Sequence, residues 1–94
     1  MRAALLLLPL LAACAAPVPP QPALPPLPAP SEDTCNATPR AALIGQPATA
    51  LERVYILGPV RIIRPGEGVT MDFSPARINF DLDATDRIAR IFCG

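Results

Sequence analysis

Few side chains in this sequence could carry chemistry. It has 94 residues, three cysteines and no histidine, and all eight basic residues are arginine. Without histidine, neither a Ser–His–Asp nor a Cys–His catalytic site can form, and three cysteines are too few for a Cys₄ zinc site. Enzyme chemistry would have to rest on carboxylates alone. We therefore expect a protein that is not an enzyme and that uses no cofactor.

Two clusters resemble ligand sites at first reading. Asp81, Asp83 and Asp86 have the charge for a calcium ion, but their position between two predicted strands favours a turn capped by carboxylates. Gly66 and Gly68 suggest a phosphate loop, but no Lys-Ser/Thr pair and no helix follow them. The formal net charge is zero, and no basic patch stands out, which argues against nucleic-acid binding. We predict no metal site and no nucleic-acid partner.

Cys14 ends a segment that is typical of an export signal. Arg2 provides the positive start, a leucine-rich run follows, and the apolar run ends by Ala16. This run is far short of the ~20 residues of a membrane-spanning helix. The stretch Leu-Ala-Ala-Cys at 11–14 resembles the bacterial lipoprotein box. An ordinary secretory signal with a chance cysteine is the alternative.

By this resemblance, residues 1–13 are a lipoprotein signal peptide, and Cys14 is acylated and becomes the first residue of the mature chain. Several acyl chains anchor a protein stably, whereas one alone is marginal. Ala15, rather than aspartate, follows the cysteine, which in many Gram-negative bacteria implies transport to the outer membrane. We expect a lipid-anchored protein of the bacterial cell envelope, on the outer membrane facing the periplasm.

A proline-rich linker over residues 14–31 separates this anchor from a domain over residues 32–94. Its prolines are Pro17, Pro19, Pro20, Pro22, Pro25, Pro26, Pro28 and Pro30. Polyproline II rises ~3.1 Å per residue, so the linker could span roughly 50 Å. A spacer is the simplest interpretation, and a ligand for a proline-binding domain or a segment that crosses the cell wall are the alternatives.

Cys35 and Cys93 lie at the two ends of the domain. In an oxidising periplasm this arrangement predicts one disulfide that closes almost the whole domain, with two free thiols as the alternative. A domain of this length buries only ~60% of its unfolded surface. A covalent link between its ends therefore has a physical reason.

The elements that must position these residues follow from turn signals and apolar periodicity. Thr38 and Pro39 favour a helix start, and Gly58 and Pro59 favour a helix end. Ile78, Phe80 and Leu82 alternate with polar residues, as in a strand. The predicted elements are a short helix 38–45, a helix 47–56, a strand 60–64, a strand 77–82, a turn 83–86 and a last strand 87–93.

The loop between the first two strands, residues 65–75, is long for so small a domain, and such loops are usually functional. Its centre, Val-Thr-Met-Asp-Phe at 69–73, is β-prone and can present its backbone to a partner as an added strand. Met71 on its own is more often a core residue, but its position between turn residues favours exposure. Phe73 has an equal case for partial burial, and Arg77 on its own reads as a solvated strand residue.

Several stretches together resemble a known inhibitor family. They are Leu-Ile-Gly-Gln-Pro at 43–47, Val-Arg-Ile-Ile-Arg-Pro-Gly at 60–66, Val-Thr-Met-Asp-Phe at 69–73, Arg-Ile-Asn at 77–79 and the final Cys-Gly at 93–94. Over about residues 35–94 the sequence resembles peptidase inhibitor family 78, the fungal elastase inhibitor family, and more distantly the potato inhibitor I family. The resemblance implies a small α/β (α+β) domain, with a helix packed on a short mixed sheet and a long exposed reactive loop.

The resemblance further implies a monomeric inhibitor of serine proteases that acts like a substrate. The protease-binding loop would comprise Gly68, Val69, Thr70, Met71, Asp72 and Phe73. Met71 would be P1, the residue that enters the protease S1 pocket, and Met71–Asp72 the scissile bond, so that Thr70 is P2, Val69 P3 and Phe73 P2′. A flexible, medium-sized methionine suits subtilisin-, chymotrypsin- and elastase-like enzymes, and not trypsin-like ones.

Bracing of the loop would come from the strand that follows it. Arg77 matches one bracing arginine of the potato family, but Asn79 occupies the second bracing position and Ser74 also replaces an arginine. These departures imply either weaker inhibition or bracing by Arg61, Arg64 or Arg90. Two other functions stay open. One is a non-inhibitory envelope lipoprotein that binds a partner through the same loop, and the other is a purely structural lipoprotein.

Overall fold

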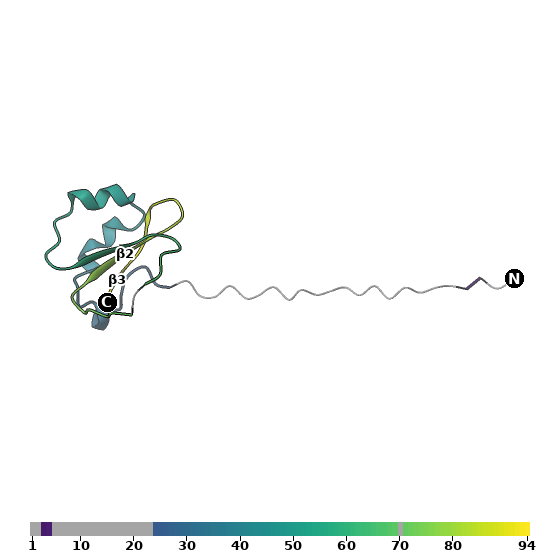
Figure 1. Cartoon of the computed structure of the whole chain (residues 1–94), viewed down its shortest axis with the longest axis horizontal. Helices are drawn as coiled ribbons and strands as arrows, with labels where there is room; N and C mark the ends of the chain where they lie inside the picture. Colours follow the sequence, from purple (N-terminus) through teal and green to yellow (C-terminus); the bar gives the residue numbers. More distant parts are fainter. Residues whose placement is uncertain (1–2, 5–23, 70) are drawn as a thin grey trace.

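Three strands form one mixed sheet in the order β1-β2-β3. β1 (Val60–Ile63) pairs in parallel with β2 (Ile78–Leu82), which pairs antiparallel with β3 (Ile88–Cys93). Figure 1 shows this computed structural model, which describes residues 3–4, 24–69 and 71–94. The predicted signal peptide, Cys14, most of the linker and Thr70 lie outside the described residues. Three 3₁₀ helices precede the sheet, namely η1 (Pro30–Glu32), η2 (Thr38–Leu43) and η3 (Ala48–Arg53).

The core is built around the central strand β2. Ile78, Phe80 and Leu82 are buried, as their alternation predicts, and they pack with Ile88 and Ile91 of β3. Asn79, on the opposite face of β2, is also fully buried. Both faces of β2 are therefore buried. One face carries apolar side chains, and the buried residue on the other face is the polar Asn79.

The helical segments are shorter than the sequence predicts. The expected helix 47–56 is wrong in type and length, because η3 is a 3₁₀ helix of six residues, and the described residues contain no α-helix. Pro47 and the residue after it are held by the two residues before β3, through a bridge to Arg87 and a hydrogen bond from Ala48 N–H to the Asp86 carbonyl (2.9 Å). At the other end Val54 is extended, and three β-branched or aromatic residues in a row at 54–56 are poor helix formers.

None of the helices among the described residues is long and apolar enough to cross a membrane.

The long loop follows from the parallel pairing of β1 and β2. Two parallel strands need a crossover of about a dozen residues, because the chain must return to the starting end of the sheet. Here the return runs from residue 64 to residue 77 with no strand or helix in its described part. The predicted loop 65–75 is confirmed in this position. Because it connects opposite ends of two parallel strands, most of its described residues are exposed.

One disulfide joins the two ends of the domain, as predicted. Cys35 and Cys93 are bonded across a sequence separation of 58, with their Cα atoms 5.5 Å apart. Both cysteines are half-buried and pack against the core cluster. The disulfide connects the segment before η2 to the last residue of β3.

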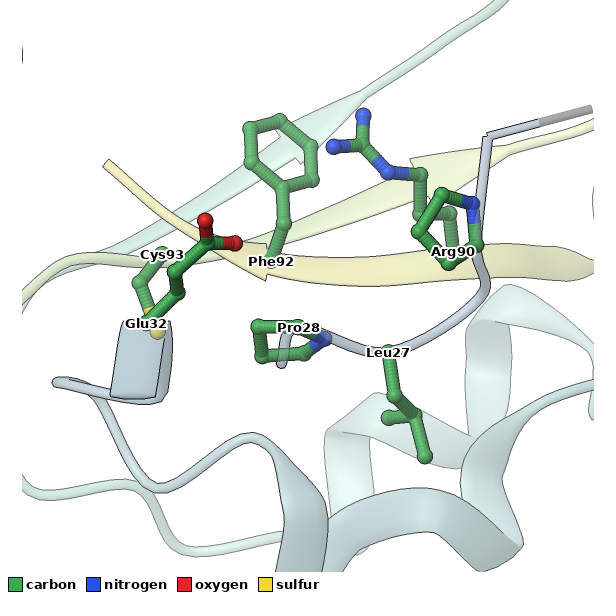
Figure 2. Close-up of a pocket in the computed structure, with 7 residues that line it drawn as sticks. Leu27, Pro28, Glu32, Arg90, Phe92 and Cys93 are labelled. Carbon is green, nitrogen blue, oxygen red and sulfur yellow. The ribbon is translucent and has the colours of Figure 1, made fainter. Parts of the chain in front are cut away.

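The end of the proline-rich linker lies along the free edge of β3. Residues 24–28, here called the edge segment, contact this strand through a hydrogen bond from Ile91 N–H to the Pro26 carbonyl (2.9 Å). Leu27 is half-buried and packs against the core. Figure 2 shows Leu27 and Pro28 beside Phe92 and Arg90, whose guanidinium lies 4.0 Å from the centre of the Phe92 ring.

Leu27→Ala is therefore expected to lower the free energy of unfolding by roughly 1–2 kcal/mol, less than for a fully buried leucine, because part of its surface already faces water. Leu24→Ala is the matched control, since Leu24 in the same segment is 68% exposed. Urea unfolding of both variants measures the difference. Equal stabilities for the two variants would mean that the edge segment does not pack on the domain in solution.

Candidate functional site

The loop between β1 and β2 presents apolar side chains to solvent. Met71 is 100% exposed, and Val69 and Phe73 on either side of it are 53% and 74% exposed. Gly68 is exposed as well. Thr70, the predicted P2 residue, lies outside the described residues. A contiguous group of exposed apolar side chains is typical of interaction sites, so this loop is the candidate recognition site.

Two arginines hold Asp72, the residue directly after Met71. Arg77 donates from Nη1 to the Asp72 carboxylate (3.3 Å) and from Nη2 to the Asp72 main-chain carbonyl. Arg61 on β1 places its Nη1 3.7 Å from the other carboxylate oxygen. Asp72 is thus held through both its carboxylate and its main-chain carbonyl, by Arg61 on β1 and by Arg77 directly before β2.

Both arginines are themselves fixed at their Nε atoms. Arg77 donates from Nε to the main-chain carbonyl of Gly94 (2.7 Å), and Arg61 donates from Nε to Oδ1 of Asn79 (2.7 Å). The arginine side chains are largely covered, with 15% and 22% of their surface exposed. A guanidinium held at its stem loses less rotamer freedom when it pairs than a free surface arginine does.

Asn79 acts one step away from the loop. Its Oδ1 accepts from Arg61, and its Nδ2 lies within hydrogen-bond distance of the carbonyls of Gly94 (3.0 Å), Phe92 (3.3 Å) and Arg77 (3.4 Å). Full burial of an amide is tolerated only when its polar atoms are paired in this way. Asn79 therefore orients Arg61, the second arginine that lies within ion-pair distance of Asp72.

Gly94, the last residue, lies against the Phe73 side chain of the loop. A Cβ atom at this position would lie 3.0 Å from two ring carbons of Phe73, and its φ of +146° is one that L side chains rarely adopt. Its N–H donates to the Arg77 carbonyl (3.0 Å). Only glycine allows the backbone here to approach Phe73 and accept from Arg77 together.

Of the three arginines that could replace the missing bracing residue, only Arg61 is within ion-pair distance of Asp72 among the described contacts. Arg64 donates its N–H to the Glu67 carboxylate (3.2 Å) within the loop, and Arg90 lies over Phe92. Gly94 and Thr34, whose hydroxyl donates to the Pro75 carbonyl (2.6 Å), were not predicted. Each adjoins a disulfide cysteine, and Gly94 also belongs to the Cys-Gly stretch that contributes to the family resemblance.

The carboxylates of Asp33 and Asp83 both accept hydrogen bonds from nearby residues. Asp33, Cys35 and Cys93 lie close together, but the two sulfurs are joined in a disulfide and cannot act as thiolate ligands. The pKa of Asp33 is lowered from its ordinary value of 3.8, chiefly by a hydrogen bond from the Thr38 side chain. Asp83 accepts from the hydroxyl and N–H of Thr85 and from the N–H of Arg87, as a turn-capping carboxylate does.

Acid is expected to destabilise the domain through Asp33. Its pKa is lower in the folded state than its ordinary value of 3.8, so the stability that it contributes is complete above that pH and is lost as the pH falls below it. Urea unfolding between about pH 5 and about pH 2 should show a shallower decline for Asp33→Asn than for the wild type. The same experiment on Asp83→Asn is a second test, since hydrogen bonding, chiefly from Thr85, lowers that pKa too. Parallel curves would contradict the assignment.

Comparisons with known proteins find a matching family, a similar protein and a similar solved structure. The peptidase inhibitor I78 family matches residues 35–94. The elastase inhibitor AFLEI of Aspergillus flavus is 33% identical over 52 residues, which are 54% of this chain and 76% of that protein. A crystal structure of the elastase inhibitor AFUEI is 28% identical, with a TM-score of 0.49 over 67% of this chain and 98% of that chain.

Proposed function

Since this chain belongs to the peptidase inhibitor I78 family, and is therefore not an enzyme, we propose that it inhibits serine proteases by inserting its loop as a substrate would. Met71 is P1 in this proposal and fills the S1 pocket of the protease. The residues from Val69 to Phe73 pair with the active-site cleft as an added strand. Asp72 occupies P1′.

The observation that carries this proposal is the contrast between Met71 and Asp72. Met71 is fully exposed, whereas the next residue is held by Arg61 and Arg77. A segment that is already fixed in the bound shape loses little conformational entropy when it binds. If the protease cuts the Met71–Asp72 bond, the new amine of Asp72 stays near the acyl-enzyme, and re-formation of the bond competes with hydrolysis.

The target class follows from the P1 side chain and from the relatives. The curated relative is named an elastase inhibitor, and an uncharged, medium-sized P1 suits elastase-, subtilisin- and chymotrypsin-like enzymes. Trypsin-like enzymes carry an aspartate in the S1 pocket, and the uncharged methionine side chain cannot form an ion pair with it. We therefore expect the partner to be a secreted or periplasmic protease of the first three kinds.

The test is a titration of the oxidised full chain, solubilised in a mild detergent, against subtilisin, pancreatic elastase, chymotrypsin and trypsin. Tight inhibition of the first three with little effect on trypsin is the expected result. Met71→Gly serves as the control for the position of P1. A folded, intact chain that inhibits none of them would overturn the proposal and favour an envelope protein that binds a partner through this loop.

The domain in this proposal is held at the outer membrane by acylated Cys14 and faces the periplasm. Cys14→Ser, expressed in a Gram-negative host, is expected to shift the protein from the membrane to the soluble fraction and to abolish incorporation of labelled palmitate. Ala15→Asp keeps the cysteine and is expected to retain the lipid but to change sorting to the inner membrane. A wild-type chain that incorporates no palmitate would rule out the anchor and leave the inhibitor untouched.

A further inference from the structure

Each cysteine of the disulfide has a neighbour in the chain that contacts the loop. Both neighbours contact the part of the loop that follows Asp72. Thr34, before Cys35, donates its hydroxyl to the Pro75 carbonyl (2.6 Å). Gly94, after Cys93, packs against the Phe73 ring and accepts from Arg77. The contacted residues lie on the primed side of the proposed scissile bond, from P2′ onward.

We propose that Thr34 is a positioning residue for this primed half, and that the Cys35–Cys93 disulfide joins Thr34 and Gly94 into one support beneath it. The inference rests on the proposed inhibitory function. It assigns Thr34 a role in keeping the cut inhibitor together, rather than in binding the protease.

Thr34 is suited to this role because its backbone is fixed on both sides. Its N–H donates to the Glu32 carbonyl (2.9 Å), and the N–H of the next residue, Cys35, donates to Sγ of Cys93 (3.1 Å). Just before it, the Asp33 carboxylate accepts from the N–H groups of Ala37 (2.6 Å) and Thr38 (3.0 Å). A surface hydrogen bond between flexible partners contributes little, but this hydroxyl is attached to a segment already tied down by a disulfide.

The position of the contact also matters. Pro75 lies 41 residues from Thr34 and sits between the exposed loop and β2. The loop is thus held at Asp72 by the two arginines, at Phe73 by Gly94 and at Pro75 by Thr34. These three attachments lie on the same side of the Met71–Asp72 bond, on the half of the loop that leaves as the amine when the bond is cut.

The reaction steps indicate that loss of the Thr34 contact should change the rate of hydrolysis of the cut inhibitor. Cleavage transfers the Met71 acyl group to the protease serine, and the serine proton passes to the freed amine of Asp72. Attack by that amine on the acyl-enzyme restores the peptide bond, whereas attack by water releases the cut inhibitor. Looser anchoring of residues 72–75 lowers the local concentration of the amine, so hydrolysis should gain while the first association with protease changes little.

The experiment compares Thr34→Val, which is isosteric but lacks the hydroxyl, with Thr34→Ser, which keeps it. Each full chain is mixed with an equal amount of pancreatic elastase or subtilisin, and mass spectrometry follows the fraction cut at Met71–Asp72. Thr34→Val is expected to be cut roughly 3- to 10-fold faster than the wild type, the range that corresponds to one hydrogen bond. Thr34→Ser should be cut at nearly the wild-type rate. Thr49→Val, at an exposed threonine of η3, is the matched control.

Thermal unfolding separates positioning from general stability. The expected midpoint of Thr34→Val is within a few degrees of the wild type. If Thr34→Val is cut at the wild-type rate, or if its faster cleavage comes with a large drop in the midpoint, the inference is overturned while the inhibitory function stands. If the wild type itself inhibits none of the proteases, it is the proposed function that fails.

Discussion

Met71→Gly is expected to weaken inhibition of elastase- and subtilisin-like proteases by about 10²- to 10³-fold. Burial of a methionine side chain in a pocket is worth about 1.5–3 kcal/mol, and central anchors of an interface often exceed ~2 kcal/mol on truncation. Glycine also frees the backbone at the tip of the loop. Because Met71 is fully exposed in the free protein, the free energy of unfolding should fall by no more than about 1 kcal/mol, the backbone-entropy cost of glycine.

Two further substitutions at Met71 test whether the loss of inhibition in Met71→Gly comes from the empty S1 pocket or from the more flexible backbone. Met71→Leu, of similar volume, should retain inhibition. Met71→Arg should lose inhibition of elastase and gain it against trypsin, whose S1 pocket carries an aspartate. Inhibition constants for the three variants against both enzymes measure the effect. Wild-type inhibition by Met71→Gly would show that another residue enters S1.

Replacement of both disulfide cysteines by serine is expected to lower the free energy of unfolding by about 4 kcal/mol. Cys35 and Cys93 are 58 positions apart, and closing a loop of that size removes about this much entropy from the unfolded chain. A domain of this length has a total stability of roughly 3–10 kcal/mol. The double variant should therefore be close to its unfolding midpoint at physiological temperature.

Urea unfolding at pH 7 measures this loss, with the reduced and alkylated wild type as the comparison. The double variant is preferable to either single one, because a single substitution leaves a free thiol that can pair between molecules. A loss smaller than about 1 kcal/mol would show that the sheet and the edge segment stabilise the domain without the bond. In that case the disulfide would act mainly on the loop.

The sequence predicts the parts of the fold that repeat a simple rule. The alternation of Ile78, Phe80 and Leu82 defines a strand, the two cysteines at the domain ends define the disulfide, and the glycine- and proline-bounded stretch defines the loop. Each of these rests on local periodicity or on a strong residue preference. The helix over 47–56 fails because pairing of residues 45–48 with the start of β3 is a long-range effect that no local pattern contains.

The candidate site divides in the same way. The position of Met71 between turn residues favours its exposure, and the resemblance to the potato inhibitor I family implies that Arg77 contacts Asp72. Sequence reasoning reduced the second bracing residue to three arginines, and only the pairing of β1 with β2 selects Arg61, because it sets Arg61 beside Asn79. Gly94 and Thr34 act through main-chain contacts or a single hydroxyl, and such contacts have no signature until the chain ends meet at the disulfide.

The edge segment has a consequence for how these molecules behave side by side. An uncovered outer strand offers a row of hydrogen-bonding groups on which another chain can add, which is a common route to aggregation. Here the edge segment, residues 24–28, lies along the outer edge of β3 and accepts a hydrogen bond from it. Pro25, Pro26 and Pro28 have no N–H that could bind a further strand. A neighbouring copy therefore finds no ready template at the β3 edge of the sheet, so this edge does not extend the sheet from one molecule into the next.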